Sequence, residues 1–147
     1  MQLSKKSRYG FRALIDLSIS DKKYMSLSSI AERNEIPLQF LEQVFGTLRR
    51  GGLVVGLKGS QGGYKLSRAP KKITAAEILE VLDGPYLIDR EEVSLDSSCR
   101  GIAESVQSLL IDKLNQQLDY VLKNLTLADM AERCLANEKD NQHMYYI

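Results

Sequence analysis

The sequence has few of the residues that carry metal, redox or acid–base chemistry. Its 147 residues include two cysteines, Cys99 and Cys134, and one histidine, His143. Two cysteines cannot make a disulfide framework, which fits a reducing compartment. No Ser/His/Asp set, paired metal ligands or phosphate loop can be recognised, and the glycine-rich stretch 59–63 lacks the Lys-Ser/Thr ending of a nucleotide loop. The sequence therefore predicts a cytoplasmic protein that is not an enzyme.

Long apolar runs are also missing. No window approaches the roughly 20 uninterrupted apolar residues that a membrane span needs. The first ten residues are polar and basic with no apolar segment behind them, so we expect neither a secretory signal nor a membrane partner. A composition of 44% hydrophobic and 27% charged residues is typical of one globular domain with an appendage.

The net charge of +1 conceals an asymmetry between the two parts of the chain. Residues 1–82 contain 14 Lys and Arg against 7 Asp and Glu, a net charge of +7. Residues 83–147 contain 6 against 12, a net charge of −6. A basic part joined to an acidic part is expected when only one of them meets a polyanion.

Local signals in residues 1–82 predict three helices and a hairpin. An apolar pattern covers 7–18, Ser26 is a good cap for a short helix that ends near Asn34, and Pro37 suits the first turn of a third helix. That third helix has one apolar stripe and stops at Gly51-Gly52. Two short β-type runs then flank a glycine-rich turn at 58–63.

The acidic part begins with a capping box and contains the longest helix. Thr74 with Glu77 predicts a helix over 75–82, followed by a loop and by an apolar period over 102–125. A short helical segment at 127–135 and a polar tail complete the chain. We divide it into a DNA-binding domain (1–82), a regulatory loop (83–100), a dimerisation helix with a following short helix (101–136) and a C-terminal tail (137–147).

The order of these elements predicts a mainly α fold with a small β-hairpin, a winged helix-turn-helix whose third helix enters the DNA major groove. The free face of that helix presents Gln39, Glu42, Gln43, Gly46 and Arg50. Gln can pair with adenine, Glu with cytosine, and Arg with guanine or phosphate. Further predicted DNA contacts are Lys5, Lys6, Arg8, Arg49, Lys58 and Gly59. A winged-helix module that docks proteins instead of DNA is the alternative.

Several stretches of the sequence resemble one known family. They are 4–10 (SKKSRYG), 41–43 (LEQ), 48–54 (LRRGGLV), 62–66 (GGYKL), 73–78 (ITAAEI) and 125–129 (LTLAD). Together they resemble the Rrf-two family of bacterial regulators over nearly the whole chain. The resemblance implies a homodimeric winged-helix transcription factor, usually a repressor, on a palindromic operator in double-stranded DNA. It also implies base-reading positions at Gln39, Phe40, Glu42 and Gln43, and a lysine, Lys58, where members commonly carry a wing arginine.

The same resemblance raises the question of a sensor. Family members that carry a [2Fe-2S] cluster hold it with three closely spaced cysteines, whereas this sequence has only Cys99 in that window. Because a cluster needs about four ligands, we predict no iron–sulfur cluster and no metal. Cys99 lies beside Arg100, a cation that can favour its thiolate, so it is either a redox switch or an incidental surface thiol.

The ending of the chain resembles the cluster-free, cysteine-metabolism (CymR-type) branch of the family. That branch implies a repressor of cysteine and sulfur metabolism genes with cysteine synthase as a partner. Tyr146 and Ile147 either dock into that partner or pack back on the dimer. A thiol- or redox-responsive repressor of another regulon is the alternative function.

The long helix carries an apolar stripe of about seven turns, roughly 36 Å at 1.5 Å per residue. The stripe consists of Ile102, Val106, Leu110, Leu114, Leu118 and Val121. Left exposed, it would be a large apolar patch, so we expect it to pair with the same helix of a second chain.

Overall fold

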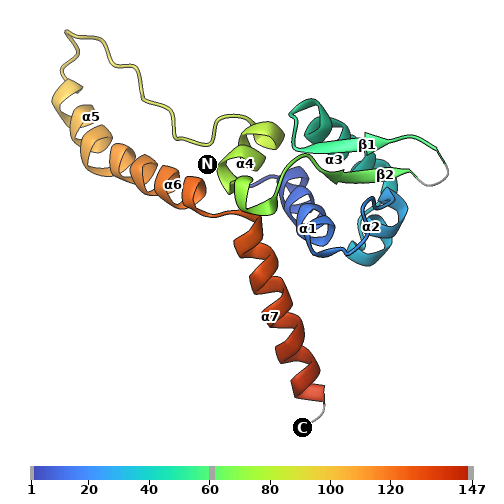
Figure 1. The fold of residues 1–147 in the computed structure, drawn as a ribbon. Coiled ribbons are helices and arrows are strands. Elements are labelled where there is room, and N and C mark those ends of the chain that lie inside the picture. Colours follow the sequence, from blue (N-terminus) through green and yellow to red (C-terminus); the bar gives the residue numbers. More distant parts are fainter. Residues whose placement is uncertain (1, 60–61, 146–147) are drawn as a thin grey trace.

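The computed structural model describes residues 2–59 and 62–145, and two helical arms project from the helices and hairpin of its N-terminal part (Figure 1). In chain order the elements are α1 (Lys5–Ile19), α2 (Leu27–Asn34), α3 (Leu38–Arg50), β1 (Val54–Leu57), β2 (Gly63–Leu66), the 3-10 turn η1 (Pro70–Lys72), α4 (Ala75–Asp83), α5 (Arg100–Val106), the π-helical turn η2 (Gln107–Ile111), α6 (Asp112–Asn124) and α7 (Leu127–Tyr145). Among the described residues, no helix is long and apolar enough to cross a membrane.

Helices α1 to α3 form the centre of the domain, and local capping sets where they begin. The Ser26 side chain accepts a hydrogen bond from the Ser29 amide and starts α2, as predicted. Pro37 differs from the expectation by one position, since it precedes α3 as its N-cap and Leu38 is the first helical residue. The fully buried apolar side chains contributed by these helices are Ala13, Leu14, Ile30, Leu41, Val44, Phe45 and Leu48.

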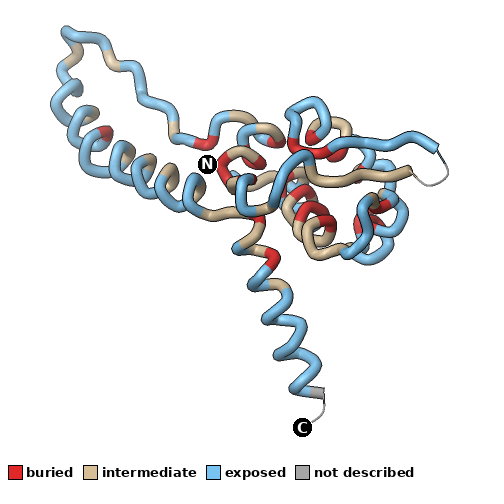
Figure 2. Tube along the Cα trace, viewed as in Figure 1, coloured by how far each residue is buried: buried red, intermediate tan, exposed pale blue. Residues whose placement is uncertain are grey.

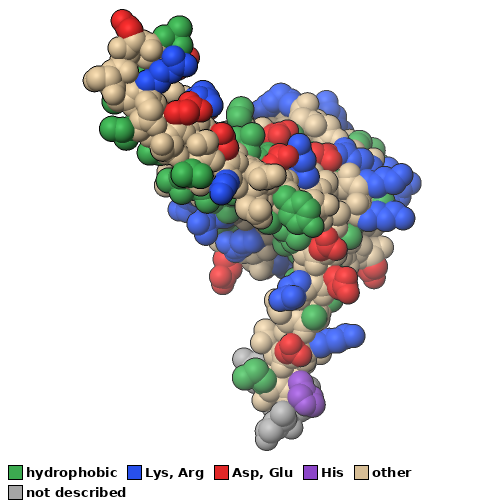
Figure 3. All heavy atoms as spheres, turned by 90° about the vertical axis from the view of Figure 1, so that its left-hand side faces the viewer, with side chains coloured by type: hydrophobic (Ala, Val, Ile, Leu, Met, Phe, Trp, Pro, Cys, Tyr) green, Lys and Arg blue, Asp and Glu red, His purple; other side chains and the backbone are tan. Residues whose placement is uncertain are grey.

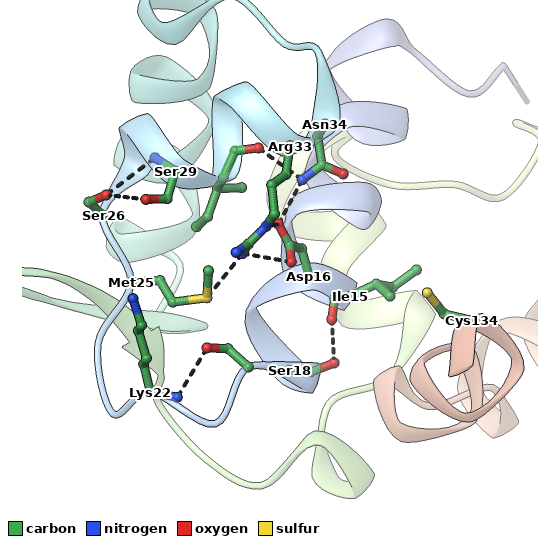
Figure 4. Close-up of polar contacts among 12 residues, drawn as sticks. Ile15, Asp16, Ser18, Lys22, Met25, Ser26, Ser29, Arg33, Asn34 and Cys134 are labelled. Carbon is green, nitrogen blue, oxygen red and sulfur yellow. Dashed lines mark hydrogen bonds and ion pairs between the residues drawn. The ribbon is translucent and has the colours of Figure 1, made fainter. Parts of the chain in front are cut away.

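A polar network fixes α2 against α1 (Figure 4). The Arg33 guanidinium donates to both carboxylate oxygens of Asp16, with its Nε 3.1 Å and its Nη2 2.8 Å from them. The Asn34 amide donates to the same carboxylate at 2.8 Å. Because the pair is bidentate, it sets the angle of α2 as well as its distance from α1.

The antiparallel hairpin β1–β2 is attached to the domain at its base. Its register pairs Val54 with Leu66 and Leu57 with Gly63. The Tyr64 amide donates to the Met25 carbonyl at 2.7 Å, and the Met25 amide donates back at 2.9 Å. The loop before α2 therefore acts as a short third strand that holds the wing in place.

Helix α4 leads through residues 84–99 to the first arm, which consists of α5, η2 and α6 (Figure 1). The Tyr86 hydroxyl donates to Asp119 Oδ1 at 2.6 Å, and burial together with this carboxylate raises the pKa of Tyr86 to about 12. The Ile88 backbone exchanges two hydrogen bonds with the Asn115 side-chain amide, at 2.8 and 2.9 Å. These contacts hold the returning chain along α6.

The long helix predicted over 102–125 is confirmed in its extent, from Arg100 to Asn124, but its interior is not uniform. Residues Gln107–Ile111 form a π-helical turn, which the apolar period alone does not reveal. This turn contains Gln107, the only buried side chain among the described residues of the arm, whose other residues are exposed or intermediate (Figure 2).

The last helix is longer than the short segment expected over 127–135, because α7 continues to Tyr145. No proline or glycine follows Ala136 to stop it, and helix-forming residues such as Glu138 and Lys139 carry it on. Its first turn is anchored, since Leu127 is fully buried and its amide donates to the Ile73 carbonyl at 2.8 Å. The rest forms the second arm (Figure 1).

Candidate nucleic-acid interface

One face of α3 and the start of α1 enclose a polar hollow of about 720 Å³. The residues around it are Lys6, Gln39, Glu42, Gln43, Gly46, Thr47 and Arg50. The opposite face of α3 is fully buried in the core. The structure thus brings together the five polar-face residues that the sequence singled out on this helix, and it adds Lys6 from α1.

The side chains in the hollow are arranged along the helix. Arg50 Nη2 donates to Thr47 Oγ1 at 3.3 Å, and the Thr47 hydroxyl in turn donates to the Gln43 carbonyl at 3.1 Å. A methyl group on Gly46 would lie 3.4 Å from Arg50 Nη1, so the glycine leaves this guanidinium room beside the helix. Thr47 was not included in the predicted polar face of α3. Its position four residues after Gln43 places it on that face and was the signal available.

The N-terminal basic cluster adjoins this hollow. Lys5 and Arg8 are exposed, whereas Lys6 is half-buried. Lys5 Nζ lies 5.7 Å from the centre of the Tyr9 ring, and the Arg12 guanidinium lies 5.2 Å from it. Tyr9 therefore supports two cations beside α3.

Unlike Gln39 and Glu42, Phe40 on α3 does not line the hollow. Its ring is half-buried and packs edge-on against Tyr9, with ring centres 5.4 Å apart. This contact joins α3 to α1 and so fixes the basic cluster relative to the hollow.

The first turn of α1 is held from the far end of α4. The Ser4 hydroxyl caps α1 by accepting from the Ser7 amide at 3.0 Å, and it donates to the Asp83 carboxylate. Burial alone would raise the pKa of Asp83, but the hydrogen bonds from Ser4 and the positive charge of Lys6 outweigh it, so the pKa is lowered. Asp83 therefore stays ionised and orders the backbone from which the basic cluster projects.

The wing supplies a third exposed surface. Lys58 and Gly59 lie exposed where β1 ends, and Gly59 has a positive φ of 112° that favours glycine. The next two residues, 60 and 61, lie outside the described part of the chain. Arg49 is also exposed but does not line the hollow on α3.

The predicted dimer stripe lies on the free side of the first arm. Ile102 is 72% exposed and Leu110 is 52% exposed, and Val106, Leu114 and Val121 are exposed as well. Leu118 is half-buried. Leu109, which is 66% exposed, is an apolar residue outside the predicted stripe and lies within the π-helical turn. Hydrophobic side chains lie along this arm in the space-filling view (Figure 3).

The cysteines do not form a metal site. Cys99 is exposed, with its sulfur 3.1 Å from the Ser97 hydroxyl, and Cys134 is half-buried on α7 beside Ile15 of α1 (Figure 4). Burial first, and then the charge of Glu138, raises the pKa of Cys134. Within residues 2–59 and 62–145, no group of three His, Cys, Asp or Glu side chains could hold a metal ion. The donor set present does not fit an iron–sulfur cluster.

Comparisons with known proteins match the chain to one family of regulators. The family model Rrf2, described as an iron-dependent transcriptional regulator, matches residues 3–133. The regulator CymR of Bacillus subtilis is 35% identical over 151 residues, which cover all of both chains. The structure described as CymR, the global cysteine regulator of B. subtilis, superposes with a TM-score of 0.75 over 90% of this chain and 98% of that one.

A second solved structure, IscR of T. potens, is 34% identical and has a TM-score of 0.70, with 91% of this chain and 88% of that one covered. These relatives are transcriptional regulators and not enzymes. The winged-helix fold and the resemblance found in the sequence are therefore confirmed. This chain belongs to the Rrf2 family of helix-turn-helix transcriptional regulators.

Proposed function

We propose that this protein is a homodimeric repressor that binds a palindromic operator and controls genes of cysteine and sulfur metabolism. The observation that carries the DNA-reading part is the hollow on α3, where a cation from α1 and polar side chains with base-pairing capacity surround one open surface. The basic charge of residues 1–82 supplies the attraction to phosphate.

Within this proposal each surface has its own task. Gln39, Glu42 and Gln43 read base edges in the major groove, and Arg50 contacts guanine or phosphate. Lys5, Lys6 and Arg8 bind backbone phosphates next to the groove. Lys58 and Gly59 carry the wing towards the neighbouring minor groove. Phe40 supports this set through its contact with Tyr9.

The dimer in the proposal is supported by the exposed stripe on α5 and α6. Several large apolar side chains on one side of a helical arm would be costly to leave in water, and a second copy of the same arm covers them by symmetry. Pairing also sets the two α3 helices at a defined separation along the operator.

The regulated genes are proposed from similarity to CymR, the protein described as a global cysteine regulator. The expected contact with cysteine synthase stays a prediction, because Tyr146 and Ile147 lie outside the described residues. The role of Cys99 as a redox switch also stays a prediction; its exposure is compatible with oxidation.

The test is the salt dependence of binding to duplexes selected from a randomised pool by the protein itself. We expect affinity to fall steeply between 50 and 200 mM salt, as it does for proteins that bind several phosphates. Arg50→Ala and Lys58→Ala should each weaken binding by about tenfold, and a phosphate-contacting cation should reduce the salt slope by about 1 when removed.

Lys139→Ala on the exposed second arm is the matched control, since it removes a cation far along the chain from α3 and the wing. It should leave both affinity and salt slope unchanged. Two results would reject DNA reading by this face. One is a selection that yields no preferred sequence, and the other is an equal loss of DNA affinity in all three variants.

A further inference from the structure

A small cavity of about 90 Å³ lies between the loop after α4 and the start of the first arm. Arg90, Glu91 and Val93 line it from the loop, and Arg100, Glu104 and Gln107 line it from α5 and η2. None of these residues belongs to the DNA-facing surface. Gln107 is buried and Val93 half-buried, and the four charged residues are exposed. The cavity is therefore a separate feature of the chain.

Opposite charges face each other in this cavity, and only some of them are paired. Arg90 Nη1 lies 3.3 Å from Glu104 Oε2, which closes one side. In the described part of the chain no ion pair engages Glu91 or Arg100. Arg100 makes one long hydrogen bond to the Leu95 carbonyl, at 3.4 Å, which leaves most of its five N–H donors available.

The floor of the cavity is a buried amide in an unusual stretch of helix. Gln107 is 7% exposed, although its neighbours along the arm are exposed. Its Nε2 donates to Asp112 Oδ1 at 2.8 Å across the π-helical turn. Single π-helical turns within α-helices are frequent at functional sites, and this turn directs the amide towards the loop.

The balance of charges decides what the cavity can accept. A simple anion would meet Arg100 but also the carboxylates of Glu91 and Glu104, and a simple cation would meet the guanidinium groups of Arg90 and Arg100. A molecule that carries both charges a few bonds apart satisfies Arg100 and Glu91 together, so each of its charged groups gains an opposite partner.

We propose that this cavity binds a small zwitterionic α-amino acid. Its carboxylate pairs with the Arg100 guanidinium, and its ammonium group pairs with Glu91. The cavity is small, at about 90 Å³, which favours an amino acid with a short side chain. Val93 and the Gln107 amide face that side chain.

Binding would join the loop to η2 and so stiffen the arm where the apolar stripe begins. The arm is attached to the loop after α4 through Tyr86 and Asp119, so the occupied site lies on the same element that places the DNA-binding domains in the proposed dimer. The binding step itself needs neither DNA nor cysteine synthase and can be measured on the free protein.

The test is isothermal titration of the full-length protein with L-alanine and L-serine, with L-phenylalanine as the oversized ligand. We expect one site per chain for the small amino acids and at least tenfold weaker binding of L-phenylalanine. Propionate and ethylamine each lack one of the two charges, and we expect both to bind at least tenfold more weakly than L-alanine. Operator binding is measured in parallel, so that failure of this proposal and failure of DNA reading remain separate results.

Arg100→Gln and Glu91→Gln should each weaken L-alanine binding at least tenfold while operator binding without ligand is unchanged. Glu92→Gln is the matched control, because Glu92 is an exposed neighbour that does not line the cavity. The proposal is overturned if no small amino acid binds at 10 mM, if propionate binds as well as L-alanine, or if both cavity variants bind like the parent protein.

Discussion

Two serines at the start of α1 should respond to the same substitution with opposite signs. Ser7 is fully buried, and its hydroxyl oxygen has no hydrogen-bond partner among the described residues. Ser4 is the N-cap of the same helix and also donates to Asp83. Replacing each by alanine removes one hydroxyl group from the same turn, so the pair is internally controlled.

The expected magnitudes come from these surroundings. An unpaired buried hydroxyl costs about 1–3 kcal/mol, and alanine is favoured over serine inside a helix by about 0.5 kcal/mol. The void left by the missing oxygen atom destabilises the protein by only a few tenths of a kcal/mol, which offsets a small part of this gain. Ser7→Ala should therefore stabilise the protein by about 1–2 kcal/mol. Ser4→Ala should destabilise it by about 1 kcal/mol, because the cap is lost.

Urea and thermal unfolding at one fixed protomer concentration measure both effects, because dimer stability depends on concentration. For a chain of this size, 1 kcal/mol corresponds to about 2–4 °C in Tm. The urea m-value should stay constant. If Ser7→Ala destabilises the protein by 1 kcal/mol or more, the hydroxyl is paired with the nearby Asp83 carboxylate and the reasoning is wrong.

Two further predictions concern the dimer and the wing. Leu110→Glu places a charge in the apolar stripe, so this variant should sediment as a monomer at micromolar concentration. The control is Leu95→Glu, at a loop leucine that is 78% exposed, and it should keep the oligomeric state of the parent protein. The same oligomeric state in both variants would refute the assigned interface. Gly63→Ala puts a methyl group against the Met25 carbonyl and should cost about 2 kcal/mol or more in urea unfolding, together with a loss of operator affinity. Gly101→Ala, at a helical position with open space around it, should change stability by less than about 0.5 kcal/mol, and an equal loss in both variants would show that the wing contact is unimportant.

The parts of this fold that could be predicted from the sequence are those determined by neighbouring residues. Ser26 and Thr74 cap their helices as expected, because a cap needs only a side-chain oxygen and an amide three residues away. The stop after Arg50 follows from two glycines. The polar face of α3 was also predictable, since its opposite face is a regular apolar stripe.

Features that depend on distant residues could not be predicted in this way. The π-helical turn does not break the apolar period, and the cavity above Gln107 exists only because the loop from Arg90 returns to the arm. Asp83 looked like the end of a helix, yet its carboxylate binds Ser4, 79 residues earlier. Nothing in local spacing indicates such a contact.

The first arm is held at two places, by the loop that follows α4 and by the first residue of α4 itself. Asn115 and Asp119 hold the returning chain near the middle of α6, and at its end the Leu125 carbonyl accepts from the Ala75 amide at 2.8 Å. A rod fixed at two points cannot pivot about either. In the proposed dimer this arm sets the spacing of the half-sites. One base pair added between them shifts them by about 3.4 Å and turns them by about 35°, a change that the two attachments of the arm oppose.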